Sequence, residues 1–251
     1  KQKTAYEIGV RLVGSEMCIR DRCYITLVIP TYRPPMTTLW TLIAAERRAL
    51  ADDLADLADA DWEARSLCTD WTIRDVVAHL TSWARLTPGP FLRSLVFHGF
   101  NLKSTMAEDM TRAAGASIQE TLDNFRSVQD FVRPVPGGGA VSMLGETVVH
   151  AEDIRRPLGI QRSYPTEALT LIADSYARSN YPIGAKKRVA GLALRATDAE
   201  WRHGTGLPVE GPLSALVVAM AGRPAALADL TGEGLAQLES RSGADTQGAT
   251  R

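Results

Sequence analysis

Residues 71–80 read Trp-Thr-Ile-Arg-Asp-Val-Val-Ala-His-Leu, and this stretch predicts both where a helix begins and what it carries. Thr72 is suited to the N-cap position, and Asp75 follows three residues later, as in a capping box. The residues after Asp75 are mostly apolar, and His79 stands among them. We therefore expect a helix that packs against a core and carries one histidine on or beside its packed face.

A second stretch, Gly145–His150, carries a carboxylate and a histidine four residues apart. At that spacing Glu146 and His150 lie on one face of a helix. Together with His79 they make the ligand set of an open catalytic zinc site, which leaves a position for water or substrate. Each residue alone has a plainer interpretation, because His79 could be a packed core histidine and the other two a surface pair. The apolar neighbours of Glu146 favour a partner for its charge, since burying an unpaired carboxylate is costly.

Other residues are weaker candidates for the metal site. His98 and His203 are interpreted as structural or surface histidines. The spacing is neither that of an HExxH protease nor that of a di-iron bundle, so we expect one divalent metal ion. Asp153 lies three residues after His150, where it would either accept a hydrogen bond from that histidine or form an exposed pair with Arg156.

The pattern of apolar residues predicts a mainly α protein. Helices are expected over 38–58, from 72 to about 103 with a break near residue 88, and over 117–131, 142–155 and 166–180. Beyond residue 185 the pattern changes to a strand over 188–196, a second strand near 201–206, and helices over 212–221, 224–230 and 234–240. We expect a helix bundle over residues 36–184, a small C-terminal α+β domain over 185–241 and a disordered tail over 242–251.

Composition narrows the class of protein. The 251 residues carry a formal net charge of −1, which gives no support for nucleic-acid binding. No apolar run is long enough for a membrane span. Three cysteines do not make a disulfide framework, and a reducing cytoplasm is the simplest expectation. Cys68 has no histidine near it in the sequence and is expected to be a small packed residue.

The first 35 residues are expected not to be native. Residues 11–22 read RLVGSEMCIRDR, which is similar to a translated sequencing adapter. We therefore leave residues 1–35 out of the fold prediction and expect the natural start at Met36.

Four motifs together resemble one known family, the mycothiol-dependent maleylpyruvate isomerases. They are Ser66–Leu80, Gly145–Asp153, Leu194–Trp201 and Ala221–Pro224. The resemblance implies a DinB-like four-helix bundle followed by a small C-terminal α+β domain. It also implies that His79, Glu146 and His150 bind a divalent metal, usually taken to be zinc, and that Arg223 acts in catalysis or in binding the thiol cofactor.

Two positions add detail to the resemblance. Arg223 follows Ala-Gly at an expected helix end, where it would cap carbonyls or bind a carboxylate with two hydrogen bonds. Thr69-Asp70-Trp71 stands where many family members have Pro-Gly-Trp, a departure that should alter the turn before the helix and not the ligands.

The resemblance implies an isomerase or transferase that uses mycothiol or a related low-molecular-weight thiol on a small, maleylpyruvate-like electrophile. Such a protein would be a cytoplasmic monomer or homodimer with no nucleic-acid or membrane partner. The alternatives are a zinc hydrolase, with Glu152 or Asp153 as its general base, and a non-enzymatic metal- or ligand-binding protein of DinB-like fold.

Overall fold

The helix that carries His79 begins where its capping residues predict. The computed structural model describes residues 36–97, 101–133 and 139–242. In it α3 (Ile73–Arg85) starts after Thr72, whose side chain accepts a hydrogen bond from the backbone of Asp75. The Asp75 carboxylate accepts in return from the Thr72 backbone at 2.9 Å. The predicted capping box is confirmed, and it fixes where the helix that carries His79 begins.

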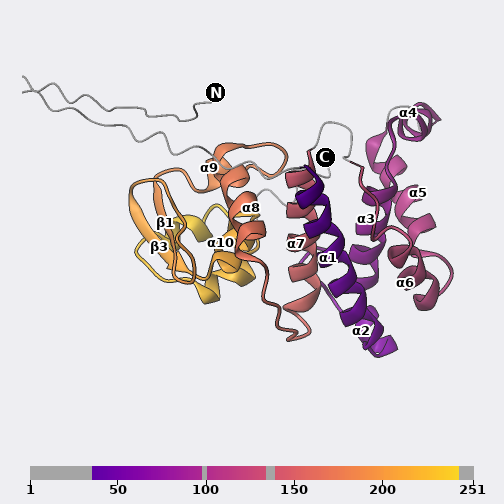
Figure 1. The fold of residues 1–251 in the computed structure, drawn as a ribbon, viewed down its shortest axis with the longest axis horizontal. Coiled ribbons are helices and arrows are strands. Elements are labelled where there is room, and N and C mark those ends of the chain that lie inside the picture. The colour runs from indigo at the N-terminus through magenta and orange to yellow at the C-terminus, as the bar shows by residue number, and fades with distance from the viewer. Residues whose placement is uncertain (1–35, 98–100, 134–138, 243–251) are drawn as a thin grey trace, which may run out of the picture. The chain divides into compact units, whose positions relative to one another are not determined.

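Four helices form the bundle, and each packs against two of the others (Figure 1). They are α1 (Met36–Ala55), α3, α6 (Ile118–Arg126) and α7 (Ala140–Arg155). A core of buried side chains joins all four and includes Leu50, Ile73, Phe125 and Ile154. The expected mainly α, DinB-like fold is confirmed, and the core fixes α3 and α7, the two helices that carry the predicted ligands.

Further helices complete this part of the chain. They are α2 (Asp59–Trp62), α4 (Pro88–Phe97), α5 (Leu102–Ala114) and α8 (Thr166–Arg178). The sequence did not predict α5, which packs against α3. No helix among the described residues is both long and apolar enough to cross a bilayer.

The C-terminal elements surround a small sheet with the strand order β2-β1-β3. They are α9 (Ala185–Arg188), β1 (Leu192–Ala196), β2 (Arg202–His203), β3 (Leu207–Gly211), α10 (Leu213–Met220), the 3-10 helix η1 (Pro224–Asp229) and α11 (Leu235–Glu239). β1 pairs with β2 in antiparallel and with β3 in parallel orientation. The strand expected over 188–196 is therefore shorter than predicted, and β3 was not predicted.

A second core cluster joins the bundle to the C-terminal elements. It contains Leu144 of α7, Ile172 of α8, Leu194 of β1 and Leu216 of α10. All described residues lie in one compact unit, so the boundary expected after residue 184 stays a prediction. The expectations for residues 1–35 and for most of the tail fall outside the described residues.

Candidate metal centre

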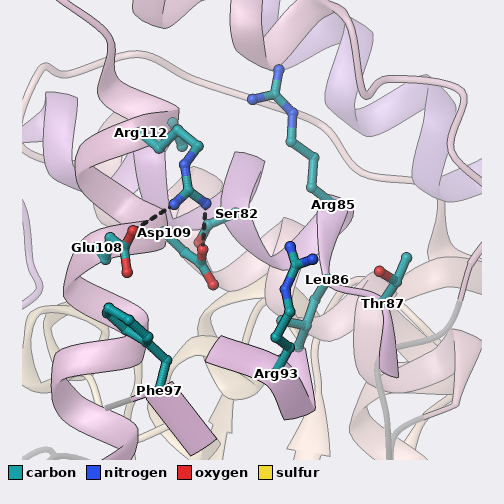
Figure 2. Close-up of a pocket in the computed structure, with 10 residues that line it drawn as sticks. Ser82, Arg85, Leu86, Thr87, Arg93, Phe97, Glu108, Asp109 and Arg112 are labelled. Carbon is teal, nitrogen blue, oxygen red and sulfur yellow. Dashed lines mark hydrogen bonds and ion pairs between the residues drawn. The ribbon is translucent and has the colours of Figure 1, made fainter. Parts of the chain in front are cut away.

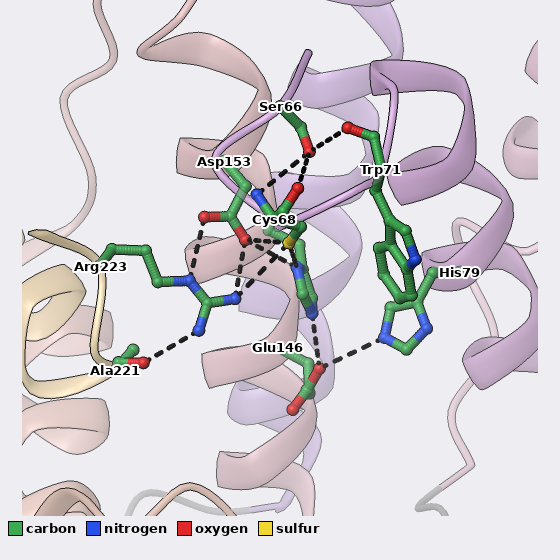
Figure 3. Close-up of polar contacts among 9 residues, drawn as sticks. Ser66, Cys68, Trp71, His79, Glu146, Asp153, Ala221 and Arg223 are labelled. Carbon is green, nitrogen blue, oxygen red and sulfur yellow. Dashed lines mark hydrogen bonds and ion pairs between the residues drawn. The ribbon is translucent and has the colours of Figure 1, made fainter. Parts of the chain in front are cut away.

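The structure brings the three predicted ligands together. Glu146 Oε2 lies 3.1 Å from His150 Nε2 and 3.8 Å from His79 Nε2 (Figure 3). The one-turn spacing along α7 aligns Glu146 with His150, and contact between α3 and α7 brings in His79. Both histidines are buried, whereas the Glu146 side chain keeps a fifth of its surface exposed. The trio is therefore reachable from the side of the carboxylate.

These separations suit one zinc ion. Two atoms bound tetrahedrally to zinc at about 2.1 Å lie about 3.4 Å apart. The two measured distances fall on either side of that value, and all three ligand atoms lie within 4.8 Å of one another. The donor types fit as well, because imidazole nitrogens and a carboxylate oxygen are among the ligands of zinc. The other ring nitrogen of His79, Nδ1, is buried without a hydrogen-bond partner among the described residues.

The protonation of the trio follows from burial and from hydrogen bonds. Burial lowers the pKa of His79 to about 4, although the hydrogen bond to Glu146 opposes this. Burial would raise the pKa of Glu146, but hydrogen bonds from His150 and His79 outweigh it and hold that pKa well below its ordinary value. At neutral pH His79 is thus neutral and Glu146 is ionised, the forms in which both bind metals.

Asp153 connects His150 to Arg223. Its Oδ2 lies 2.9 Å from His150 Nδ1 and accepts from Arg223 Nη2 at 2.9 Å, while its Oδ1 accepts from Arg223 Nε at 3.0 Å. Arg156 pairs instead with Glu152 and Asp229. Of the two interpretations of Asp153, the structure therefore shows the hydrogen bond to His150. This contact turns His150 so that its Nε2 faces Glu146.

The hydrogen bonds of Asp153 also set two protonation states. Burial would raise the pKa of Asp153, but the charge of Arg223 and the hydrogen bond from His150 hold it well below its usual range. Burial opposes a charge on His150, yet the hydrogen bonds to Asp153, Cys68 and Glu146 raise its pKa well above the ordinary value. Without a metal ion, His150 therefore carries a proton at neutral pH.

The turn that ends α10 directs Arg223 toward the carboxylate of Asp153. Gly222, with φ of 87°, donates its backbone N–H to Ala219, and Arg223 donates its own to Val218, five residues back. This pair of bonds is a Schellman motif, in which glycine supplies the left-handed residue. The turn sends the guanidinium toward α7, while Nη1 donates to the Ala221 carbonyl at 2.9 Å. Arg223 thus both caps a helix end and holds a carboxylate, that of Asp153.

The sequence led us to expect that Cys68 is only a small packed residue, but its thiol also makes polar contacts. Its Sγ lies 3.0 Å from Asp153 Oδ2, 3.6 Å from His150 Nδ1 and 3.7 Å from Arg223 Nη2 (Figure 3). The loop that places it contains Asp70 in the left-handed conformation, with φ of 67°. Nothing local in the sequence indicates these contacts, because they join residues at least 82 positions apart.

Two overlapping groups of side chains could hold a metal, and they differ in the charges of their neighbours. One is the predicted trio, and the other comprises Cys68, His150 and Asp153. Asp153 is already paired with the guanidinium of Arg223, which also lies beside the Cys68 thiol. In contrast, the ion pairs of Glu146 among the described residues are with histidines alone. A cation is therefore expected between His79, Glu146 and His150, while Arg223 supplies the positive charge of the second group.

Two tryptophans lie beside His79. The ring centre of Trp71 is 5.0 Å from that of His79, and the ring centre of Trp83 is 5.7 Å from it. They give the trio an apolar wall, which lowers the local dielectric constant and strengthens its electrostatic interactions. Of the other two histidines, His203 of β2 stacks on Trp201, and His98 lies outside the described residues.

Two pockets of the structure lie elsewhere and are not lined by the trio. One of about 330 Å³ lies among α3, α4 and α5 and is lined by Arg85, Arg93 and Arg112 (Figure 2). Within it Arg112 is paired with Glu108 and Asp109. Another, of about 920 Å³, is lined by residues near Glu152 and by parts of the C-terminal elements. The second pocket includes Arg156 and Tyr164, whose pKa values are raised, but neither pocket holds a group of three possible metal ligands among the described residues.

Fold and site together define a helix-bundle protein that gathers two histidines and a glutamate from two bundle helices and an arginine from the C-terminal elements. Residues 43–127 match the family model described as the mycothiol maleylpyruvate isomerase N-terminal domain. This segment is similar to that domain family, and the resemblance noted in the sequence is confirmed.

Solved structures give the same fold. The crystal structure of the mycothiol-dependent maleylpyruvate isomerase aligns with a TM-score of 0.56 at 16% identity, covering 80% of this chain and 93% of that one. A histidine-to-alanine mutant of that isomerase aligns with a TM-score of 0.55 at 15% identity, with the same coverage. The comparison with curated proteins gave no match.

Proposed function

We propose that this protein is a divalent-metal-dependent enzyme that uses mycothiol or a related small thiol to isomerise, or transfer the thiol to, a maleylpyruvate-like acid. The trio is the observation that carries the proposal: a preorganised ligand set, open on one side, with an anchored arginine close by. The domain family of residues 43–127 and the fold of the isomerase structures support the choice of thiol chemistry.

His79, Glu146 and His150 would hold the metal, with zinc the best fit to their mixed nitrogen and oxygen donors. When bound, the metal would lower the pKa of the cofactor thiol, so that a thiolate is available near neutral pH for reversible addition to an activated double bond. Glu146 and the two imidazoles together carry one negative charge, which leaves a bound divalent cation with net positive charge to attract the thiolate.

Arg223 would bind the substrate through a carboxylate. Its Nε and Nη2 are held by Asp153, so the guanidinium does not have to be ordered when the substrate arrives. Because Asp153 also contacts His150, the position of Arg223 is tied to the position of a metal ligand. A conservative exchange to lysine would lose this two-point hold, since lysine is a point charge.

A zinc hydrolase would need a free general base, and neither carboxylate expected for that role is free. Glu152 accepts from the Tyr164 hydroxyl at 2.7 Å and pairs with Arg156. Asp153 is held by Arg223 and His150. Both carboxylates are therefore occupied in structural contacts, and the geometry favours thiol chemistry over activation of water.

Metal analysis tests the trio first. The purified full chain should hold about one equivalent of zinc, and His79→Ala and His150→Ala should each lose most of it. His203→Ala is the matched control, because that histidine stacks on Trp201 and should leave the zinc content unchanged. Full zinc occupancy in His79→Ala would disprove the ligand assignment.

Turnover tests the reaction. The zinc-loaded protein is mixed with mycothiol and maleylpyruvate, and conversion to the trans isomer is followed by absorbance, with glutathione as a second thiol. We expect thiol-dependent conversion that Arg223→Lys reduces by about a hundredfold in kcat/KM. A zinc-loaded protein that neither binds nor uses any of these thiols would refute the thiol mechanism.

A further inference from the structure

Tyr176 of α8 brings a hydroxyl group to the side of α7 next to the trio. A Cβ atom built on Gly145 would lie 2.6 Å from the Tyr176 hydroxyl oxygen and 3.2 Å from Cζ. Only glycine at position 145 therefore lets the phenol come this close to α7. Glu146 is the next residue, so the hydroxyl lies one position along the helix from a predicted ligand.

Charged groups of the site act on this hydroxyl. Burial and the charge of Glu146 raise the pKa of Tyr176 above its ordinary value, and the charge of Asp153 adds to this while that of Arg223 opposes it. Tyr176 therefore stays protonated and can donate a hydrogen bond.

The hydroxyl has no hydrogen-bond partner within the described ranges, unlike the other tyrosine of the core. Tyr164 accepts from Arg155 at 2.9 Å and donates to Glu152 at 2.7 Å. Tyr176, whose ring packs against the core, has no comparable contact. A half-buried phenol without a protein partner is available to water or to a ligand.

The site needs such a donor, because most of Arg223 is already used. Of the five N–H groups of a guanidinium, three point to Asp153 and to the Ala221 carbonyl, and a fourth points to Cys68 Sγ. An acid with two carboxylates, or with a carboxylate and a keto group, presents more oxygens than the one remaining N–H group can bind. A further donor near Glu146 would bind one of them.

From this placement we infer that Tyr176 contacts the bound acid directly, its hydroxyl donating a hydrogen bond to a carboxylate or carbonyl oxygen of the ligand. The inference rests on the proposed function for the class of ligand, a small unsaturated dicarboxylate or keto acid. Gly145 then has the role of making room for the hydroxyl.

Tyr176→Phe removes the hydroxyl alone and gives the direct test. Zinc-loaded full chain is titrated with maleate by calorimetry, and we expect about tenfold weaker binding in Tyr176→Phe, as for loss of one hydrogen bond to a charged group. Zinc content and thermal midpoint should stay as in the wild type. Tyr181→Phe is the matched control, because that tyrosine is exposed, and it should bind maleate as the wild type does.

Turnover of maleylpyruvate with mycothiol, measured on the same proteins, separates this inference from the proposed function. If the wild type turns over and Tyr176→Phe matches it in kcat, KM and maleate affinity, the contact is refuted and the function stands. If no protein turns over but maleate binding still falls about tenfold in Tyr176→Phe, the contact stands and the function fails. If the zinc-loaded wild type does not bind maleate, the proposed contact between Tyr176 and the acid is also refuted.

Discussion

Zinc binding to the metal-free protein is expected to release about one proton at pH 5.5. His79 has a pKa of about 4 and is already neutral there, because burial disfavours its charge. Glu146 is ionised, since its pKa is held low. His150 alone carries a proton, because Asp153, Cys68 and Glu146 raise its pKa against the effect of burial. That one proton must leave before Nε2 can bind the metal.

The number of protons released when zinc binds distinguishes a preorganised site from a loose one. Two histidines with ordinary pKa values near 6.5 would together release about 1.8 protons at pH 5.5. The folded site should release about 1.0, because one of its histidines has already lost its proton. The apparent affinity for zinc should accordingly rise about tenfold per pH unit, and it should level off above the pKa of His150.

Calorimetry in buffers of different ionisation enthalpy measures the proton count, because the observed heat changes linearly with the buffer enthalpy. A slope of about 1.8 would show that neither histidine is perturbed in the metal-free protein. A slope near zero would show that His150 carries no proton. Either result would refute the reasoning, and His203→Ala should give the slope of the wild type.

The same titration affects folding, with the opposite sign. The folded pKa of His150 lies above its unfolded value of about 6.5, so the metal-free protein gains stability from this proton in full below pH 6.5. The gain is lost as pH rises through the folded pKa. Zinc affinity rises over the same interval, so zinc should stabilise the fold more at high pH than at low pH.

Three further predictions concern single side chains. Asp153→Asn should weaken zinc binding about 10- to 100-fold in a chelator competition, because it removes the acceptor that orients His150. Gly145→Ala should destabilise the wild type by about 1–3 kcal/mol in denaturant unfolding, because its methyl group would overlap the Tyr176 hydroxyl. The penalty should be clearly smaller when Tyr176 is replaced by phenylalanine. Asp70→Gly should raise stability by about 1 kcal/mol at unchanged zinc content, because glycine adopts the left-handed conformation without a steric cost.

Each of these has a result that contradicts it. Unchanged zinc affinity in Asp153→Asn would mean that His150 is oriented by other contacts. Equal penalties for Gly145→Ala in the two backgrounds would show that the tyrosine hydroxyl is not the obstructing group. A loss of stability in Asp70→Gly would indicate that the aspartate side chain stabilises the turn by more than its backbone conformation costs.

Local patterns in the sequence were enough for α3 and for two of the three predicted ligands. The Thr72 capping box and the Glu146–His150 spacing depend on the geometry of one helix, and the structure has both. β3 was harder to predict, because it contains Pro208, which cannot donate to a sheet. Its place at the edge of the sheet makes the proline tolerable, and an edge position is visible only once the strand order is known.

Contacts between distant residues could not be predicted in the same way. The sequence left Asp153 between two partners, and the choice depended on Arg156 finding Glu152 and Asp229 instead. Cys68 contacts Arg223 across 155 positions, a distance over which no helical period gives information. These contacts follow from how α7 packs against the loop before α3 and against the end of α10, which is a property of the whole core.

The family match covers only one part of the candidate site. The matched segment, residues 43–127, contains His79 but ends before Glu146 and His150, and it does not reach Arg223. Sequence similarity to the family model therefore accounts for one of the four residues on which the proposal depends. The other three come together with it only in the folded chain, where the four-residue spacing on α7 and the Schellman turn after α10 direct them to the same place. A site assembled from separate parts of the chain, each with its own local reason for its geometry, is hard to explain as an accident of packing, because packing alone gives no reason for a largely buried glutamate to lie between two imidazoles.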